Sequence, residues 1–290
     1  MKLFPNCKIN IGLRVVRKRE DGYHDLETIF YPVYGLYDEL EVDPINQSQD
    51  HRQNSVEFIQ EGLSVDCSTD DNLIIKCYNR MRAKYPQIGD VRIRFKKNIP
   101  FGAGLGGGSS DAAHMAIALN EIFNLGLTQE QLAQEVRHLG ADCPFFVFNS
   151  PCYAEGIGDE LTPIDLSLSD MRLVMIKPEC GVSTKDAYGG IVPKGNSELF
   201  RVAQNRLELF GMAYNDFEDT VFAIYPQLAS IKERLQDAGA IYTAMSGSGS
   251  TIYGLFQVDT ECTTLTNLRL LHEEFASMII FDDTLSKTKP

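Results

Sequence analysis

The sequence predicts an α+β fold with mixed or antiparallel sheets. Its strand-like segments alternate apolar residues with polar or small ones, whereas the buried strands of a parallel sheet would be continuously apolar. Segments with helical signals, such as a capping box and one-sided apolar spacing, occur between these strands without a regular strand–helix period. The 290 residues, 43% hydrophobic and 23% charged, provide enough apolar material for a sizeable core split into two lobes.

Two paired strands are predicted near the N-terminus. Apolar residues alternate with polar or small residues over residues 8–15, which is typical of a half-buried strand. Asp21-Gly22 is a tight-turn signal, and a second strand-like segment follows at residues 26–30. We therefore expect the two segments to pair through a loop that contains Tyr23 and His24.

A strand and two helices are predicted in the middle of the chain. Residues 91–97 alternate and then give way to glycines, which indicates a strand that ends in a loop. Residues 112–123 read as a helix. Thr128 and Gln131 form a capping box for a second helix, and Gly140 follows that helix where a terminating glycine is expected.

The second half of the chain predicts a helix followed by a β-hairpin. Pro226 suits the first position of a helix whose apolar residues lie on one face, and Gly239 can end it. A strand over residues 240–245 then meets the segment Ser246-Gly-Ser-Gly-Ser250, and the chain returns as a strand over residues 251–256.

The charge and the cysteines exclude several classes of protein. The 27 basic and 40 acidic residues give a formal charge of −13, which repels nucleic-acid phosphates and anionic lipid. The charged, proline-interrupted start does not resemble a signal peptide, and no apolar run approaches the ~20 residues that span a bilayer. Seven widely spaced cysteines without a Cys-x-x-Cys pair favour small core residues in a reducing compartment. We expect a cytoplasmic protein without nucleic-acid or membrane partners; the sequence leaves both a monomer and a homodimer open.

The densest chemical signal is the glycine-rich segment from Pro100 to Ala113. Its glycines allow close backbone approach and positive φ angles. The free N–H groups at the start of the following helix favour an anion. The segment therefore predicts a loop that binds phosphate groups.

Three known phosphate-binding patterns fit this segment poorly. Gly102, Gly104 and Gly107 match the dinucleotide pattern Gly-x-Gly-x-x-Gly, but the preceding strand is amphipathic. The acidic residues about twenty positions later fall in helical segments instead of ending a strand. A P-loop requires lysine after its last glycine, where Gly108 and Ser109 stand instead. No His-Arg-Asp or Asp-Phe-Gly element of a protein kinase is present.

Three motifs in the expected order resemble the signatures of the GHMP kinases. Lys8-Ile9-Asn10 is similar to their N-terminal motif, and the segment from Pro100 to Ser110 resembles their ATP-binding motif. The segment from Ser246 to Ser250 resembles their third motif. The resemblance extends from about residue 5 to about residue 256.

Three further segments are similar to one branch of that superfamily, the diphosphocytidyl-methylerythritol kinases. They are Asp21-Gly22-Tyr23-His24, residues 140–146 (Gly-Ala-Asp-Cys-Pro-Phe-Phe) and residues 215–218 (Asn-Asp-Phe-Glu). The resemblance implies ATP- and Mg²⁺-dependent phosphorylation of the 2-hydroxyl of 4-diphosphocytidyl-2-C-methyl-D-erythritol. This reaction releases ADP and belongs to the non-mevalonate pathway of isoprenoid (terpenoid) biosynthesis.

The same resemblance implies a two-lobed fold. The N-terminal lobe would be like ribosomal protein S5 domain 2 and the C-terminal lobe ferredoxin-like. We place an N-terminal ATP-binding domain at residues 1–158 and a C-terminal GHMP kinase domain at residues 159–290.

The resemblance implies that Asp142 is the general base and that Lys8 is its cationic partner. A carboxylate can take the proton of the attacking alcohol as the new bond forms. An ammonium group can hold that carboxylate ionised and also bridge to the phosphate. Without the resemblance, Asp142 would be interpreted as a turn or capping residue and Lys8 as a solvated strand residue.

The family binds a cytidine diphosphate group, which implies a set of substrate-binding residues. Tyr23 and Tyr188 occupy positions that resemble the pair of rings enclosing the cytosine. His24 would recognise the edge of the base, because a neutral imidazole donates from one nitrogen and accepts at the other. Asn10 would contact the methylerythritol hydroxyls together with Asp142, and Thr184 could join them.

The resemblance also implies the ATP-binding residues. Asn72 and Lys97 would lie near the adenosine, and Ser110 or Asp111 could contact Mg²⁺ directly or through water. The glycine-rich loop would enclose the phosphates through Pro100, Gly102, Gly104, Leu105, Gly106, Gly107, Gly108, Ser109 and Ser110. The third motif would close over the phosphates or the substrate through Ser246, Gly247, Ser248 and Gly249.

Two other functions remain compatible with part of this pattern. Another GHMP kinase, for homoserine, mevalonate or a sugar, would share the glycine-rich loop but would not need Tyr23-His24 or the segment around Asp142. A non-catalytic nucleotide sensor on the same fold would be expected to lose Lys8 or Asp142, and both are present.

Overall fold

The computed structural model describes residues 1–45, 56–64, 68–195, 205–258 and 262–285. The chain forms two compact units, each assembled from segments that alternate along the sequence. Unit 1 comprises residues 1–7, 36–101 and 106–150, and unit 2 comprises residues 8–35, 102–105 and 151–290. The domain boundary at residue 158 stays a prediction.

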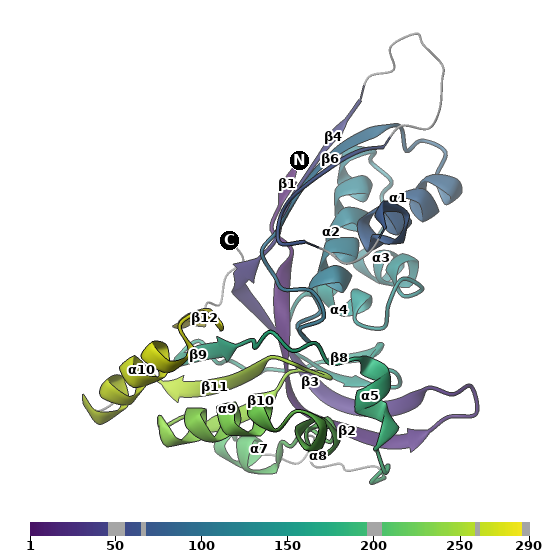
Figure 1. Cartoon of the computed structure of the whole chain (residues 1–290). Coiled ribbons are helices and arrows are strands. Elements are labelled where there is room, and N and C mark those ends of the chain that lie inside the picture. Colours follow the sequence, from purple (N-terminus) through teal and green to yellow (C-terminus); the bar gives the residue numbers. More distant parts are fainter. Residues whose placement is uncertain (46–55, 65–67, 196–204, 259–261, 286–290) are drawn as a thin grey trace. The chain divides into compact units, whose positions relative to one another are not determined.

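Unit 1 contains a four-stranded sheet in the order β1-β4-β6-β5. These strands are β1 (Lys2–Leu3), β4 (Glu39–Pro44), β5 (Glu57–Gly62) and β6 (Val91–Lys97). β6 pairs with β4 in the antiparallel and with β5 in the parallel direction. The helices are η1 (Thr69–Asp71), α1 (Leu73–Lys84), α2 (Gly107–Ile122), α3 (Gln129–Val136) and α4 (Cys143–Phe148). Helices α1 to α4 gather on one side of this sheet (Figure 1).

The predicted elements of unit 1 are present, with two corrections at helix ends. β6 covers the predicted residues and buries alternate side chains, and the capping box of Thr128 and Gln131 is formed. α2, however, begins at Gly107, five residues before the predicted start, because Gly106 already adopts the left-handed N-cap conformation. α3 ends at Val136 with Arg137 as its C-cap, so Gly140 does not terminate it.

Unit 2 contains most of one sheet, β2-β3-β7-β8, and all of a second, β10-β11-β9-β12. The strands of the first are β2 (Asn6–Lys18), β3 (His24–Tyr37), β7 (Cys152–Glu155) and β8 (Glu160–Pro163). Those of the second are β9 (Met171–Ile176), β10 (Tyr242–Met245), β11 (Ile252–Gln257) and β12 (Ile279–Thr284). The helices are α5 (Thr184–Gly189), α7 (Arg206–Met212), α8 (Phe217–Ile224), α9 (Pro226–Asp237) and α10 (Cys262–Phe275).

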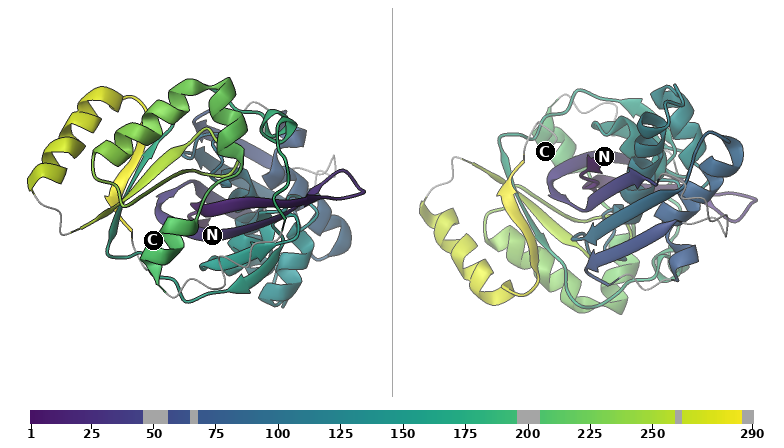
Figure 2. Two further views of the ribbon diagram at one scale, coloured as in Figure 1. Left: turned by 90° about the horizontal axis from the view of Figure 1, so that it is seen from below. Right: turned by 90° about the horizontal axis from the view of Figure 1, so that it is seen from above.

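The predicted pairs of strands in unit 2 are confirmed. β2 and β3 are neighbours in their sheet, and β10 pairs with β11 in the antiparallel direction. β3 already begins at His24, so the loop predicted to contain Tyr23 and His24 contains only Tyr23 of the two. α9 begins at Pro226, and Gly239 follows it with a φ of 97°. The green helix α9 and the yellow helix α10 lie along one face of the second sheet (Figure 2). Their apolar residues share a core with β9 and β11, which explains the one-sided spacing in the sequence.

The described cysteines behave as predicted. Cys7, Cys77, Cys143 and Cys152 are buried free thiols, and Cys180 is a half-buried one. Cys67 lies outside the described residues, as does the side chain of Cys262.

Among the helices that the structure describes, none has the length and apolar character needed to cross a membrane.

Asp282 links three elements of unit 2. Its carboxylate, on β12, accepts hydrogen bonds from both Nε and a terminal nitrogen of Arg172 on β9, at 2.5 and 2.7 Å, and also contacts Nε2 of His272 on α10. Burial alone would raise the pKa of Asp282, but Arg172 and then His272 outweigh it, so that the pKa is lowered.

We expect Asp282→Asn to reduce the free energy of unfolding by about 1–3 kcal/mol near neutral pH, because a neutral amide loses the charge-assisted bonds. A carboxyl group with a lowered folded-state pKa stabilises the fold above its unfolded pKa of about 4. This contribution disappears as the pH falls through the folded-state value. Urea unfolding at several pH values should therefore show the gap between wild type and variant closing in acid. Asp283→Asn, at the exposed next position, is the control; equal losses from both variants would refute this role for Asp282.

Candidate active site

Lys8 and Asn10 project from the same face of β2, because side chains alternate along a strand. Both are buried, with 3% and 2% of their surfaces exposed. Lys8 Nζ donates to Asn10 Oδ1 at 2.5 Å and lies 5.0 Å from the centre of the Phe30 ring. Asn10 Nδ2 donates in turn to Thr28 Oγ1 on β3 at 3.0 Å. Asn10 thus uses both ends of its amide to hold Lys8 in place.

The carbonyl oxygen of Gly104 joins the three sequence motifs. It accepts hydrogen bonds from Lys8 Nζ at 3.1 Å and from Ser246 Oγ at 2.9 Å. Gly104 has a φ of 76°, and a Cβ atom there would lie 1.9 Å from the carbonyl oxygen of Ser246. The N-terminal motif, residues 102–105 of the glycine-rich segment and the third motif therefore contact one another inside unit 2.

The third motif forms a tightly held loop between β10 and β11. The N–H of Ser246 donates to the carbonyl of Thr251 at 2.9 Å, and Ser250 Oγ donates to the carbonyl of Cys180 at 2.6 Å. Ser246 and Ser250 are buried, whereas Ser248 is half-buried. Ser248 is therefore the serine of this motif whose hydroxyl is most accessible to a ligand.

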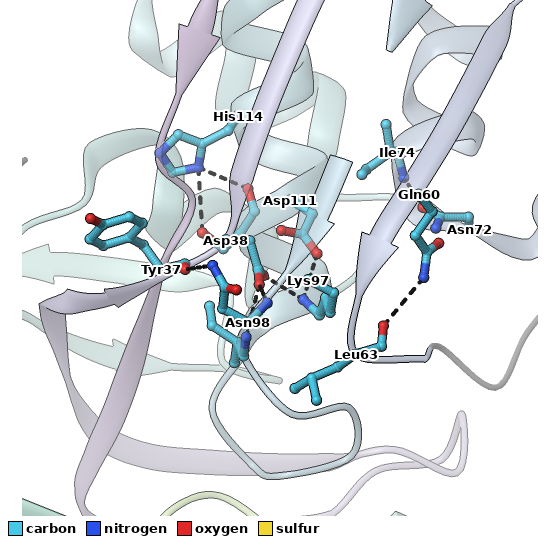
Figure 3. Close-up of polar contacts among 12 residues, drawn as sticks. Tyr37, Asp38, Gln60, Leu63, Asn72, Ile74, Lys97, Asn98, Asp111 and His114 are labelled. Carbon is cyan, nitrogen blue, oxygen red and sulfur yellow. Dashed lines mark hydrogen bonds and ion pairs between the residues drawn. The ribbon is translucent and has the colours of Figure 1, made fainter. Parts of the chain in front are cut away.

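A buried charge cluster in unit 1 surrounds Lys97 (Figure 3). Lys97 Nζ donates to Asp38 Oδ2 at 2.5 Å and to Asp111 Oδ2 at 2.8 Å. Asp38 Oδ1 accepts from the backbone N–H groups of Asn98 and Ile99 at 2.6 and 2.8 Å. Asp38 thus fixes both the lysine and the chain that leads from β6 into the glycine-rich segment.

The charges of this cluster influence one another strongly. Burial on its own lowers the pKa of Lys97, but Asp111 and then Asp38 outweigh it, so that this pKa is raised. Burial raises the pKa of Asp111 well above its ordinary value, against the opposing effect of Lys97. Among the described residues, Asp111 Oδ1 is buried without a hydrogen-bond partner. The cluster therefore holds an ammonium group and one unused carboxylate oxygen beside each other.

The unit 1 part of the glycine-rich segment runs directly into α2. Gly106 has a φ of 69° at the N-cap. A Cβ atom on Gly107 would lie 3.0 Å from Lys97 Nζ, so the ammonium group lies against the first residue of the helix. Ser110 is fully buried, with Oγ 3.4 Å from His114 Nδ1. Its hydroxyl is therefore engaged inside the helix rather than exposed at its start.

Asp142 occupies the N-cap position of α4, but its carboxylate does not cap that helix. The side chain is half-buried. The neighbouring Cys143 is buried, and burial raises the pKa of its thiol to about 12. Cys143 is therefore protonated near neutral pH and acts as a packing residue, as its position in the sequence suggests.

Asn72 has a structural task of its own. Its Oδ1 accepts the N–H of Ile74 at 2.9 Å and caps α1 (Figure 3). An amide oxygen can accept a second hydrogen bond and the amide nitrogen can donate two, so the cap leaves room for the predicted contact with adenosine, which stays a prediction.

The aromatic residues predicted to bind cytosine lie in unit 2. His24 stacks on Tyr188, with ring centres 4.6 Å apart and an angle of 21°, and Phe217 packs edge-on against Tyr188 at 4.7 Å. Burial and then Lys18 lower the pKa of His24, which keeps the imidazole neutral. Tyr23 is 62% exposed, beside the predicted tight turn. The ring that covers Tyr188 in this structure is thus His24 rather than Tyr23.

The predicted residues fall into one set in each unit. Unit 1 holds Asn72, Lys97, Pro100, Gly106, Gly107, Gly108, Ser109, Ser110, Asp111 and Asp142. Unit 2 holds Lys8, Asn10, Tyr23, His24, Gly102, Gly104, Leu105, the exposed Thr184, Tyr188 and residues 246–249. Lys8 and Asp142 belong to different units, so their pairing stays a prediction.

Two residues that no sequence motif indicates hold predicted site residues in place. Thr28 fixes Asn10, and Asp38 fixes Lys97. The only sequence signal for Asp38 is its position, a carboxylate between two strand-like segments. Its use as the partner of Lys97, 59 positions away, depends on the pairing of β4 with β6.

Two family models match separate segments of the chain. The model of the GHMP kinases N terminal domain matches residues 72–150, and that of the GHMP kinases C terminal matches residues 196–261. The first contains α2 and Asp142, and the second contains the third motif.

Named relatives match nearly the whole chain. A 4-diphosphocytidyl-2-C-methyl-D-erythritol kinase of Bacteroides fragilis is 45% identical over 267 residues, which are 91% of this chain and 95% of the relative. The kinase of the same name from Parabacteroides distasonis is 42% identical over 264 residues, covering 90% and 93% of the two chains.

Solved structures agree with these relatives. A crystal structure of 4-(cytidine 5'-diphospho)-2C-methyl-D-erythritol kinase matches with a TM-score of 0.79 and 30% identity, covering 99% of this chain and 100% of that one. A homoserine kinase from Cytophaga hutchinsonii, at 16% identity and a TM-score of 0.69, covers 98% and 96% of the two chains and shares the fold alone. The chain belongs to the GHMP kinases and, among them, to the family of 4-diphosphocytidyl-2-C-methyl-D-erythritol kinases.

Proposed function

We propose that this chain transfers the γ-phosphoryl group of ATP to the 2-hydroxyl of 4-diphosphocytidyl-2-C-methyl-D-erythritol, releasing ADP, in isoprenoid precursor biosynthesis. The geometry that supports this proposal best is the double hydrogen bond to the Gly104 carbonyl. It brings an ammonium group, a glycine-rich segment and a serine–glycine loop together. Phosphoryl transfer depends on positioning and on neutralising charge, and such an arrangement suits both.

Asp142 is the proposed general base. The acceptor is a tertiary alcohol, a very weak acid, so its proton has to leave as the new bond to phosphorus forms. A half-buried carboxylate at the start of α4 has the chemistry that this step requires. The proton then resides on a carboxylate oxygen of Asp142 while the phosphoryl group moves to the alkoxide oxygen.

Lys8 supplies positive charge to the same step. Its ammonium group is buried, and its hydrogen bonds to Asn10 and Gly104 fix its position before substrate binds. A charge that needs no rearrangement stabilises the developing negative charge more effectively than a solvated one. Asn10 then acts mainly by orienting Lys8, in addition to its predicted contact with the substrate.

The nucleotide is proposed to bind along the glycine-rich segment and Lys97. The N–H groups at the start of α2 provide donors for phosphate oxygens, and Lys97, with Asn72, is the proposed neighbour of the adenosine. Asp111 is the proposed contact for Mg²⁺, because its unpartnered Oδ1 fits a cation that takes few protein ligands and keeps several waters. When bound, that ion neutralises charge on the transferred phosphoryl group.

Cytidine recognition is proposed to involve Tyr23, His24 and Tyr188. The planar face of Tyr188 that His24 covers here is suited to a pyrimidine ring. For the base to stack on that face, His24 moves aside, and its neutral imidazole can then bond to the edge of the base. Thr184, one turn before Tyr188 on α5, is close enough in sequence to contribute its exposed hydroxyl.

Replacing Asp142 by Asn should lower kcat by on the order of 10²-fold or more, since the amide cannot accept the proton. The KM for ATP should stay near the wild-type value. Steady-state kinetics in a coupled ADP-release assay measure both. Asp165→Asn, an exposed carboxylate in unit 2, controls for the loss of one negative charge. Wild-type turnover in Asp142→Asn would refute the assignment.

Replacing Gly104 by Ala should weaken ATP binding by on the order of tenfold or more. The new Cβ atom would meet the Ser246 carbonyl at 1.9 Å and push the two loops apart. Gly126→Ala is the matched control: its φ of 70° carries the same backbone strain, but no atom lies within 4 Å of the added carbon. Calorimetric titration with ATP should distinguish the two variants. Equal affinities would show that the contact is irrelevant to nucleotide binding.

The function itself is tested with a panel of acceptors and Mg²⁺-ATP. We expect phosphorylation of the cytidyl substrate at its 2-hydroxyl and almost none of homoserine, mevalonate or galactose. The uridine analogue should fail, because each buried donor–acceptor mismatch costs about 1–3 kcal/mol. Faster turnover of homoserine or mevalonate would leave the superfamily intact and refute the substrate.

The aromatic residues are tested in the same assay. Tyr23→Ala and Tyr188→Ala should each raise the KM for the cytidyl substrate about tenfold, because stacking on a base is worth about 1–3 kcal/mol. The KM for ATP should change less. Tyr188→Phe retains the ring and its packing against Phe217, so its KM should stay within about twofold of wild type. Unchanged KM values in both alanine variants would contradict a stacked cytosine.

A further inference from the structure

The segment from Asn215 to Glu218 has a distinctive sequence but no role in the mechanism above. It lies at the start of α8, and it is buried although three of its four side chains are polar: Asn215 is 1%, Asp216 4% and Glu218 1% exposed. Buried polar side chains are costly unless they are hydrogen-bonded, so their partners indicate their task.

Asn215 holds the backbone of the third motif. Its Nδ2 donates to the carbonyl oxygens of Met245 and Gly247, at 2.7 and 2.8 Å. Its Oδ1 accepts the N–H of Phe217 at 3.0 Å, which fixes the amide orientation with both hydrogens on the loop. One side chain thus connects the residues on both sides of Ser246.

Glu218 binds the backbone N–H of Met245, the residue directly before this loop. Its Oε1 accepts the N–H of Met245 at 2.8 Å, and its Oε2 accepts from Lys232 Nζ on α9 at 2.5 Å. Burial raises the pKa of Glu218, and the Lys232 ammonium group opposes this effect. Met245 is therefore bound through its N–H by Glu218 and through its carbonyl by Asn215.

The same segment is attached to the strand that carries Lys8. Asn215 forms a bridge with Leu13 of β2, and the N–H of Asp216 donates to the carbonyl of Leu13 at 2.8 Å. Asp216 Oδ2 accepts the N–H of Val15 at 2.8 Å. The segment therefore connects β2 with the third motif by a route that does not pass through Gly104.

We propose that Asn215 and Glu218 are positioning residues for phosphoryl transfer, which set the backbone of residues 245–247 so that Ser246 meets Gly104 beside Lys8. The inference rests on the proposed kinase function. A loop with two glycines at positive φ has many conformations available, and the fixed side chains select one before ATP binds. Without them, binding would have to order the loop.

Asn215→Asp tests the proposal with almost no change in size. The carboxylate keeps an acceptor for Phe217 but directs an anion at two carbonyl oxygens in place of a donor. We expect a rise in the KM for ATP on the order of tenfold, together with a fall in kcat on the order of tenfold or more. A residue that contributes to stability alone would lower the unfolding temperature without moving the KM of the folded fraction.

The variants at Glu218 separate the loop contact from the ion pair. Glu218→Gln keeps an acceptor for the N–H of Met245, whereas Glu218→Leu removes it; both remove the ion pair. Lys232→Met removes the ion pair from its other end and leaves the Met245 contact in place. We expect Glu218→Leu to behave like Asn215→Asp, and Glu218→Gln and Lys232→Met to lose stability while the KM for ATP stays within about twofold of wild type.

Amide hydrogen exchange of residues 245–251, measured on the protein without substrates, provides a readout independent of activity. Exchange should be faster than wild type in Asn215→Asp and Glu218→Leu and unchanged in Lys232→Met. Uniform acceleration in all three variants, or wild-type KM and exchange in Asn215→Asp, would overturn the proposal. An inactive wild-type enzyme would instead refute the proposed function, and the exchange experiment would still decide whether these residues hold the loop.

Discussion

The part of the candidate site that lies in unit 2 depends on the two hydrogen bonds to the carbonyl oxygen of Gly104. A glycine-rich segment has few side chains with which to fix its own position, so partners elsewhere in the chain must fix it. Lys8 provides a charged donor and Ser246 a hydroxyl donor for the same oxygen. Because a Cβ atom at Gly104 would overlap the Ser246 carbonyl, the contact requires glycine at this position.

Buried ion pairs likewise fix the backbone next to the glycine-rich segment and the third motif. Lys97 is held by Asp38 and Asp111 in unit 1, and Glu218 is held by Lys232 in unit 2. Such pairs add little stability by themselves, but removing one partner leaves an uncompensated charge and costs several kcal/mol. Their main effect is therefore to define geometry: Asp38 fixes the chain before the glycine-rich segment, and Glu218 fixes Met245 before the third motif.

The sequence predicted the strands and helices better than the contacts between distant residues. Most strand positions followed from local patterns, and β6 and the Thr128 capping box were located correctly. α2 begins five residues before the predicted start, because Gly107 and Gly108 are helical here although glycines favour loops. Asp38, Thr28 and the loop contacts of Asn215 were missed, since each depends on a contact between residues far apart in the chain.

By itself, the sequence determined the elements and the chemistry available to them, because periodicity, turn residues and motif spacing act over a few residues. The tertiary structure alone decided which groups meet. In the folded chain, Lys8 and Ser246 donate to the same carbonyl oxygen, that of Gly104. Lys97 lies between the carboxyl groups of Asp38 and Asp111, and the ring of His24 stacks on that of Tyr188. The physical reason is that a buried polar group takes the nearest partner that the fold provides, and sequence separation does not limit that choice.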